Sequence, residues 1–455
     1  MQTSSIDAIV AQLVVHFIGN EEVASSSLVN STILFDIAKE NVWLNMANMS
    51  FFQKLTIKEK YKNRYVAIGA GGTGGHVFPA IAVAKKLIEH NYRVLFFTDK
   101  RSFDYIKQYS SLLDNNAFTI VFLTSKNAPR WKQFFMIIRD LWRCRFILTE
   151  RVSLCIGFGG LVSFPVILFG ILTFKTTIIH EANAVMGLAN RLLLPFVRVC
   201  LTSFEETKKI PKKYKKTKII NVGMPIRDEI KKYVYNQDNP SVNYRMFYKI
   251  EDVINITIFG GSQASEVFDK IIPQAIILLP NHISNKLHII HQCRKENCNT
   301  VAEKYANANI AAKVAPFFNN VGDLMRQSHL MIARAGSSCL AEMTSLGVPS
   351  ILIPLPSAKD NHQYENAKCL SNNNGAMLIE QSTLTPERLC EMLKHLLEHD
   401  ALLYEMSVVA KKYSSVYADL KILAVINRCL GYEEDIEISS NLANVRYIND
   451  NVGLG

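Results

Sequence analysis

Two glycine-rich segments in separate halves of the chain carry the clearest chemical signal. Residues 69–76 read Gly-Ala-Gly-Gly-Thr-Gly-Gly-His, and residues 260–263 read Gly-Gly-Ser-Gln. Each follows a short apolar run, Tyr65–Ile68 or Ile254–Phe259, and precedes a helical pattern. Such turns bind phosphates through backbone N–H groups and a helix N-terminus. Two of them, about 190 residues apart, predict two Rossmann-like domains around a shared cleft and an enzyme that uses a diphosphate-bearing donor.

The first glycine turn also admits a second interpretation. A G-x-G-x-x-G pattern starts at Gly69, and Asp99 stands where it could bind a ribose, which together indicate an NAD-dependent dehydrogenase. The segment contains more glycines than this pattern requires. It also continues through His76 to Pro79, a residue that suits the first turn of a helix. A histidine on such a loop can act as a general base near neutral pH, or it can cap or pack the turn.

Length and composition narrow the class of protein. The 455 residues exceed what one core accommodates, and the hydrophobic content of 49% supports two sizeable cores. A net charge of +11 favours anionic partners such as phosphates and acidic lipids. No nucleic-acid-binding module is evident, so we expect no nucleic acid partner. The nine scattered cysteines are expected to be reduced thiols without a metal. The first residues, Met1 to Asp7, carry no basic charge, which argues against a secretory signal.

Short apolar runs that alternate with helical patterns predict an α/β protein with two parallel sheets. We expect an N-terminal extension of unknown role, two Rossmann-like domains joined by a linker, a last helix that packs back on the first domain, and an acidic tail. We read residues 402–430 as helical throughout. These segments correspond to residues 1–63, 64–223 (first domain), 224–250 (linker), 251–410 (second domain), 411–430 and 431–455.

One stretch resembles a membrane span in its hydropathy. Residues 152–174 carry no charge, but glycines divide them and Pro165 follows. We therefore predict a buried strand, a glycine turn and an apolar helix instead of a transmembrane helix.

Seven motifs, in this order and at these spacings, resemble the bacterial MurG glycosyltransferases of family 28, which convert lipid I to lipid II in peptidoglycan synthesis. The resemblance covers residues 64–430. It implies a GT-B fold, a UDP-N-acetylglucosamine (UDP-GlcNAc) donor, a lipid I acceptor and inverting transfer without a cofactor or an essential metal. The motifs are Gly71–Pro79, Gly157–Ser163, His180–Ala184, Gly223–Arg227, Gly260–Gln263, Arg334–Glu342 and Asp360–Ala367.

The resemblance assigns roles to individual residues. His76 is the candidate base for the 4-hydroxyl of the acceptor sugar, and His180 and Glu181 are alternatives or orienting groups. Glu342 matches the acid that binds the donor ribose, while Arg227 either pairs with the diphosphate or forms an interdomain salt bridge. The substrate-binding candidates are Thr73, Gly74, Gly75, Asn183, Arg227, Ser262, Gln263, Arg334, Glu342, His362 and Gln363.

Two positions depart from the family pattern. The family often has glutamine where this chain has Ala182, and tyrosine where it has Leu161. Both positions fall in first-domain loops, so they bear on the acceptor more than on the donor.

A lipid acceptor requires contact with a bilayer. Residues 130–143 combine aromatic and basic side chains at helical spacing, which is typical of a helix lying in an anionic membrane surface. A core-facing helix is the alternative, and the lysine-rich residues 208–218 could assist. We therefore predict a peripheral protein at the cytoplasmic face of the inner membrane. The predicted contact residues are Trp131, Phe134, Phe135, Ile138 and Trp142.

Three other functions remain open from the sequence. The first is a transferase with another lipid acceptor, and the second is the NAD-dependent enzyme, although one Rossmann domain suffices for that cofactor. The third is a sugar-nucleotide-binding protein without catalysis, which would still bind UDP.

Overall fold

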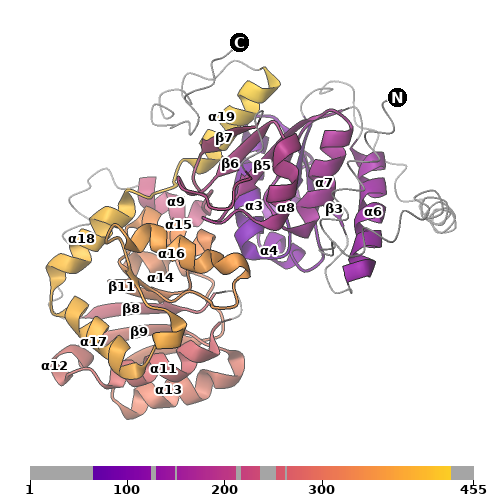
Figure 1. Cartoon of the computed structure of the whole chain (residues 1–455). Helices are drawn as coiled ribbons and strands as arrows, with labels where there is room; N and C mark the ends of the chain where they lie inside the picture. Colours follow the sequence, from indigo (N-terminus) through magenta and orange to yellow (C-terminus); the bar gives the residue numbers. More distant parts are fainter. Residues whose placement is uncertain are drawn as a thin grey trace, which may run out of the picture.

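The computed structural model describes residues 65–123, 130–148, 151–211, 217–235, 253–261 and 264–431. The predicted extension and the acidic tail from residue 432 lie outside these ranges. The described part forms two α/β units, each built on its own sheet (Figure 1).

The first sheet has seven strands in the order β3-β2-β1-β4-β5-β6-β7, and every neighbouring pair is parallel. Its central strands are buried on both faces, which explains why they read as continuous apolar runs. The strands are β1 (Tyr65–Gly69), β2 (Arg93–Thr98), β3 (Phe118–Phe122), β4 (Val152–Gly157), β5 (Thr176–Glu181), β6 (Val199–Thr202) and β7 (Lys218–Asn221).

Helices cover both faces of this sheet and create a core on each. One core packs α3 against the sheet, and the other packs α7 against it. The helices are α3 (Gly74–Glu89), α4 (Phe103–Lys107), α5 (Ser110–Leu113), α6 (Arg130–Ile147), α7 (Gly160–Leu172) and α8 (Leu188–Leu193), followed by the 3-10 turn η5 (Leu194–Phe196).

The second sheet has six parallel strands in the order β10-β9-β8-β11-β12-β13. Its strands are β8 (Ile254–Phe259), β9 (Leu287–Gln292), β10 (Ala311–Ala315), β11 (Leu330–Ala333), β12 (Ser350–Leu352) and β13 (Met377–Leu378). Its helices are α11 (Glu266–Ile277), α12 (Asn281–Ser284), α13 (Cys298–Asn307), α14 (Val321–Gln327), α15 (Ser337–Leu346), α16 (His362–Ser371), α17 (Pro386–Leu397) and α18 (Asp400–Lys411), with 3-10 turns η6 (Lys295–Asn297), η7 (Lys359–Asn361) and η8 (Gln381–Thr383). The predicted α/β fold with two Rossmann-like domains is confirmed.

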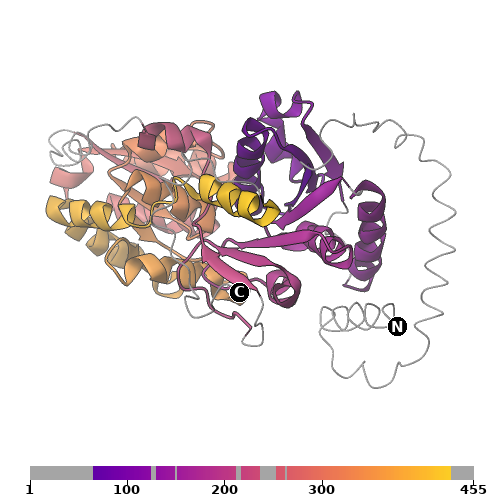
Figure 2. The same ribbon diagram turned by 90° about the horizontal axis from the view of Figure 1, so that it is seen from above.

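The chain passes between the two domains twice. The first passage includes α9 (Asp228–Tyr235), which lies inside the predicted linker. The second passage ends in α19 (Ala418–Leu430), which packs on α3 and adds Ile422 and Leu423 to a core of the first domain. Figure 2 shows this yellow helix lying on the first domain.

The prediction of one continuous helix over residues 402–430 is wrong. Helix α18 ends at Lys411 and α19 begins at Ala418. Between them the chain leaves the second domain, and the backbone N–H of Ser415 donates to Ser345 Oγ at 3.1 Å. The two helices bury their apolar faces in different cores, α18 in the second domain and α19 in the first.

The uncharged stretch from residue 152 divides as the sequence predicts, into β4 and the 13-residue helix α7. Within the described ranges, no helix has both the length and the hydropathy needed to span a bilayer.

Candidate active site

A cleft of ≈1930 Å³ lies between the two domains. Residues from both glycine turns line it, as do residues of α3, α15 and the loop before α16. This position, at the carboxyl ends of parallel strands, is where open α/β sheets bind ligands. The volume exceeds what one drug-sized ligand needs, so the cleft can hold a sugar nucleotide and part of a second substrate.

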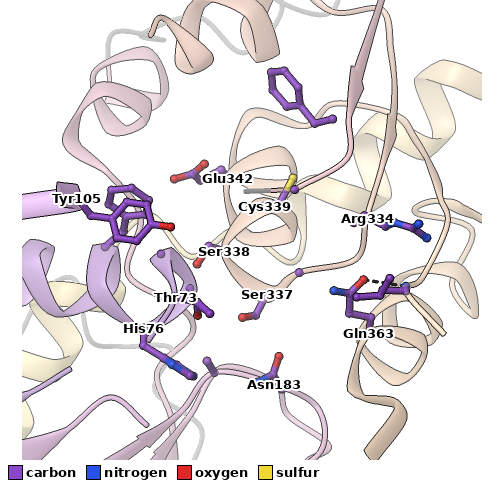
Figure 3. A pocket seen from close by; sticks show the side chains of 18 of the residues that line it. Thr73, His76, Tyr105, Asn183, Arg334, Ser337, Ser338, Cys339, Glu342 and Gln363 are labelled. Atoms are coloured by element: carbon purple, nitrogen blue, oxygen red, sulfur yellow. Dashed lines mark hydrogen bonds between the residues drawn. The ribbon is translucent and has the colours of Figure 1, made fainter. Parts of the chain in front are cut away.

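His76 lies in the first turn of α3 and faces the cleft from the first domain (Figure 3). Its Nδ1 is 3.3 Å from the carbonyl oxygen of Gly71. If Nδ1 carries the hydrogen and donates it to that carbonyl, the neutral ring has its lone pair on Nε2, which is the form a general base requires.

Two glycines make room for this imidazole. Gly159 has φ of +91° and Gly160 has φ of +78°, values that side chains disfavour. A Cβ at Gly159 would lie 3.2 Å from His76 Nε2, and a Cβ at Gly160 would lie 2.9 Å from the carbonyl oxygen of Gly71. The turn that follows β4 is therefore shaped around the predicted base.

Glu181 is buried and organises the loop that follows β5. Its carboxylate accepts hydrogen bonds from the backbone N–H of Gly187 at 2.8 Å, from Asn190 Nδ2 at 2.8 Å and from the backbone N–H of Asn183 at 3.0 Å. Burial raises the pKa of Glu181, and these donors oppose the rise. Because its oxygens are already engaged, this geometry favours a positioning role over the predicted role as a base.

His180 is almost fully buried at the wall of the cleft. It is buried against Phe158, and its Nε2 lies 3.1 Å from the carbonyl oxygen of Gly223, to which it can donate. Burial lowers the pKa of His180 to about 4, so its ring stays neutral at physiological pH. Its contact ties β5 to the start of the first interdomain passage.

The neutral state of His180 predicts an acid-sensitive fold. The unfolded residue takes up a proton near its ordinary pKa of 6.5, whereas the folded residue does so only near a pKa of about 4. Between these values the unfolded state binds more protons, so the free energy of unfolding falls as pH drops, by up to about 3 kcal/mol. In urea unfolding, His180→Gln should lose less stability from pH 6.5 to 4. An equal loss would assign the effect to other groups, such as buried His291.

Arg227, at the start of the first interdomain passage, forms an ion pair with Glu342 of α15. Arg227 Nε donates to Glu342 Oε1 at 2.7 Å, and one terminal nitrogen donates to Oε2 at 2.7 Å. Arg227 also pairs with Glu229 at 2.7 Å, and its guanidinium lies 5.3 Å from the ring centre of Phe78. The sequence alternative of an interdomain salt bridge is therefore what the structure contains. Both residues still line the cleft, so the predicted donor contacts remain open to them.

Arg334 lines the cleft, and its guanidinium is engaged in hydrogen bonds to the surrounding loops. Its guanidinium donates to the carbonyl oxygens of Ile353 and Pro354 at 3.0 Å each, to Ser265 Oγ at 2.8 Å and to Gln381 Oε1 at 2.7 Å. Burial lowers the pKa of Arg334 to about 10, and the residue supports the start of α11 beside the second glycine turn.

The remaining predicted binding residues distribute between the two walls of the cleft. The first domain contributes Thr73, Gly74, Gly75 and Asn183, and the second contributes His362 and Gln363. Gln363 Oε1 accepts a hydrogen bond from the backbone N–H of Leu355 at 2.9 Å (Figure 3). Ser262 and Gln263 lie outside the described residues, although Gly260 and Gly261 beside them line the cleft.

The structure adds residues that the sequence did not single out as site residues. Phe78 and Tyr105 line the cleft with their rings edge to face, 5.4 Å apart. Asn366 is buried and bonds to Asn183 across the domain boundary. The motif Asp360–Ala367 contained Asn366, but nothing local in the sequence indicated which groups its amide meets.

The predicted membrane segment is a helix, α6. Of the five predicted contact residues, Trp142 has a described side chain, and it is 37% exposed. The side chains of Trp131, Phe134, Phe135 and Ile138 lie outside the described part. Among the described residues, no cluster of three or more histidine, cysteine or acidic side chains could hold a metal ion.

Comparison with known proteins agrees with this geometry. The glycosyltransferase family 28 N-terminal domain matches residues 66–202, and the family's C-terminal domain matches residues 255–419. Two curated relatives carry the name UDP-N-acetylglucosamine–N-acetylmuramyl-(pentapeptide) pyrophosphoryl-undecaprenol N-acetylglucosamine transferase. The one from Paramagnetospirillum magneticum is 35% identical over 76% of this chain and 91% of its own length. The one from Rickettsia felis is 33% identical over 75% and 93%.

The structural similarity points the same way. The crystal structure of Acinetobacter baumannii MurG aligns with a TM-score of 0.62 at 28% identity, over 80% of this chain and 99% of that one. A UDP-GlcNAc 2-epimerase from Neisseria meningitidis, 13% identical with a TM-score of 0.57, shares the fold over 80% and 99%. The sequence resemblance is confirmed: the chain belongs to glycosyltransferase family 28, with the MurG N-acetylglucosamine transferases, and is a hexosyltransferase with the GT-B fold.

Proposed function

We propose that this protein transfers N-acetylglucosamine from UDP-GlcNAc to the 4-hydroxyl of the N-acetylmuramyl sugar in lipid I, with inversion, to give lipid II. The observation that carries the proposal is the arrangement of the cleft. A histidine seated by two glycines faces it from the first domain, and the acid Glu342 faces it from the second. The names of the relatives supply the identities of the two substrates.

The second domain is the proposed donor side. Glu342 offers carboxylate oxygens to the ribose hydroxyls, and its bonds to Arg227 occupy only part of their capacity. Arg227 can turn from Glu342 toward the donor diphosphate, because both lie at the same edge of the cleft. The backbone N–H groups at the N-terminus of α11 and in the turn at Gly260 can stabilise the negative charge that the leaving UDP carries.

The first domain is the proposed acceptor side. His76 Nε2 removes the proton of the acceptor hydroxyl while that oxygen attacks the anomeric carbon, and UDP leaves from the opposite face of the sugar. Glu181 fixes the loop that carries Asn183, which contacts the substrates beside the base. Ala182 and Leu161 line the same side, so they shape the acceptor site.

We further propose that the enzyme works at the cytoplasmic face of the inner membrane as a peripheral protein. A polyprenyl diphosphate acceptor is embedded in a bilayer, and the net charge of +11 favours an anionic surface. Helix α6, with Trp142 and two neighbouring arginines exposed, supports contact through this part of the first domain.

The test is release of UDP from UDP-GlcNAc in the presence of a short-chain lipid I analogue. We expect release that depends on the acceptor and a product that contains both sugars. Binding of UDP without release would favour another lipid acceptor or a non-catalytic binding protein, which a series of lipid-linked sugars then separates. Failure to bind UDP would overturn the donor assignment.

A further inference from the structure

A cluster of interdomain ion pairs joins the first domain to the loop that precedes α16 and to the first turn of that helix. Arg191 donates to Asp360 Oδ2 at 2.8 Å, and Lys209 Nζ lies 2.6 Å from Asp360 Oδ1. Lys208 Nζ lies 2.6 Å from Glu365 Oε2. All three cations belong to the first domain, and both carboxylates belong to the second.

The loop held by the two pairs on Asp360 contains two successive residues in the left-handed region. Asp360 and Asn361 both have φ of +55°, in the left-handed region that is unfavourable for residues with a side chain. His362 and Gln363, the predicted ligands of the donor sugar, follow immediately. The two cations on Asp360 therefore stabilise the turn that places these ligands.

A second contact fixes the other end of the same segment. Asn366 is fully buried, and its Oδ1 accepts a hydrogen bond from the backbone N–H of Ala184 at 2.8 Å. Its Nδ2 donates to Asn183 Oδ1 and to the carbonyl oxygen of Ala335, each at 3.1 Å. The start of α16 is thus attached to the loop after β5, whereas the ion pairs at its surface remain open to solvent and can break.

We propose that Arg191 and Lys209 are positioning residues for the donor sugar, which act through Asp360 and couple the acceptor-side loop to the sugar-binding loop. Neither cation lines the cleft, so any effect they have on the donor is transmitted through Asp360. Arg191 follows Asn190, which bonds to Glu181. This connects the ion pairs on Asp360, called the latch below, to the loop that carries Asn183. The inference rests on the proposed function, because it assumes a sugar-nucleotide donor.

The strength of the pairs suits a reversible latch. Partly exposed ion pairs are individually weak and are screened by salt, so they bias closure without locking the domains. In the proposed binding mode the nucleotide lies at Glu342, away from the loop held by Asp360, and the sugar lies at His362 and Gln363, which follow that loop. Affinity for UDP-GlcNAc should therefore depend on the latch, and affinity for UDP should not.

The experiment measures dissociation constants for UDP and for UDP-GlcNAc by calorimetry in wild type and in the double variant Arg191→Gln, Lys209→Gln. We expect UDP-GlcNAc to bind about 3- to 10-fold more weakly in the variant, with UDP binding unchanged. Raising the salt concentration should weaken binding of UDP-GlcNAc in wild type more than in the variant. Glu89→Gln, which removes an ion pair within α3, is the matched control and should change neither constant.

A charge exchange provides a second readout. Glu365→Lys should weaken binding of UDP-GlcNAc, and adding Lys208→Glu should restore it, because the pair is rebuilt with opposite polarity. Equal losses for UDP and UDP-GlcNAc, or no loss at all, would overturn the latch. A wild-type protein that binds neither ligand would instead contradict the proposed function.

Discussion

Replacing His76 with alanine is expected to lower kcat by about 10²- to 10⁴-fold while UDP still binds with unchanged affinity. The loss follows from removal of the proposed base, because His76 faces the cleft with Nδ1 beside the Gly71 carbonyl, and a hydrogen on Nδ1 places the lone pair of the neutral ring on Nε2. UDP binding is retained because His76 is not among the proposed nucleotide contacts, which are Glu342, Arg227 and the N-terminus of α11. The measurements are acceptor-dependent UDP release and calorimetric binding of UDP.

A second variant separates placement of the base from its presence. Gly159→Ala keeps the imidazole but puts a Cβ 3.2 Å from His76 Nε2, at a φ of +91° that alanine disfavours. We expect kcat to fall by about 10-fold or more, since small displacements of reacting groups are costly. Gly431→Ala lies outside the cleft, at a φ of +74° and with open space around the added Cβ, and is the control for backbone strain. If His76→Ala retains full activity, Glu181 becomes the candidate base again.

The variant Glu342→Gln is expected to weaken UDP binding by about 10- to 100-fold and to destabilise the protein. Glutamine keeps the shape of the side chain, but it removes the charge that two short bonds from Arg227 meet at a buried position. Breaking a buried ion pair from one side leaves the partner charge uncompensated, which costs about 3–5 kcal/mol in comparable cases. Calorimetry with UDP and urea unfolding measure the two effects separately.

The partner charge offers a control for this prediction. Arg227 keeps its contact with Glu229 in the variant, so the protein should still fold. The double variant Arg227→Met, Glu342→Gln removes both charges and should recover part of the stability without recovering UDP binding. Unchanged UDP affinity in Glu342→Gln would refute the ribose-binding role and leave the ion pair as a purely structural contact.

Buried parallel strands are the part of this fold that the sequence predicts best. The apolar run Ile254–Phe259 has the bounds of β8, and Tyr65–Ile68 matches β1 to within one residue, because strands covered on both faces are apolar throughout. The helix after the first glycine turn was predicted to start near Pro79, but α3 begins at Gly74. Glycine has low helix propensity, so the residue types at the start of α3 do not indicate that its first turn is helical.

The site was predictable as a set of residues and less so as a set of contacts. Motif order placed His76, Glu342 and Gln363 at the cleft, because each follows a strand at the ligand-binding edge. The bonds between Arg227 and Glu342 join residues 115 positions apart, and no local pattern encodes them. The engagement of Glu181 by Asn190 and Gly187 depends on how the loop after β5 turns back, which becomes visible only in the folded chain.

The return of α19 to the first domain has a consequence for biosynthesis. Ile422 and Leu423 belong to the same core as β1 and β7, although the sheet's own strands end at Asn221. A ribosome must therefore synthesise about 200 further residues, which takes on the order of 10–40 s at bacterial rates, before this core can close. During that interval the second domain can fold first, and the first domain keeps an apolar groove exposed along α3. The first domain thus completes this core only after the second domain has been synthesised.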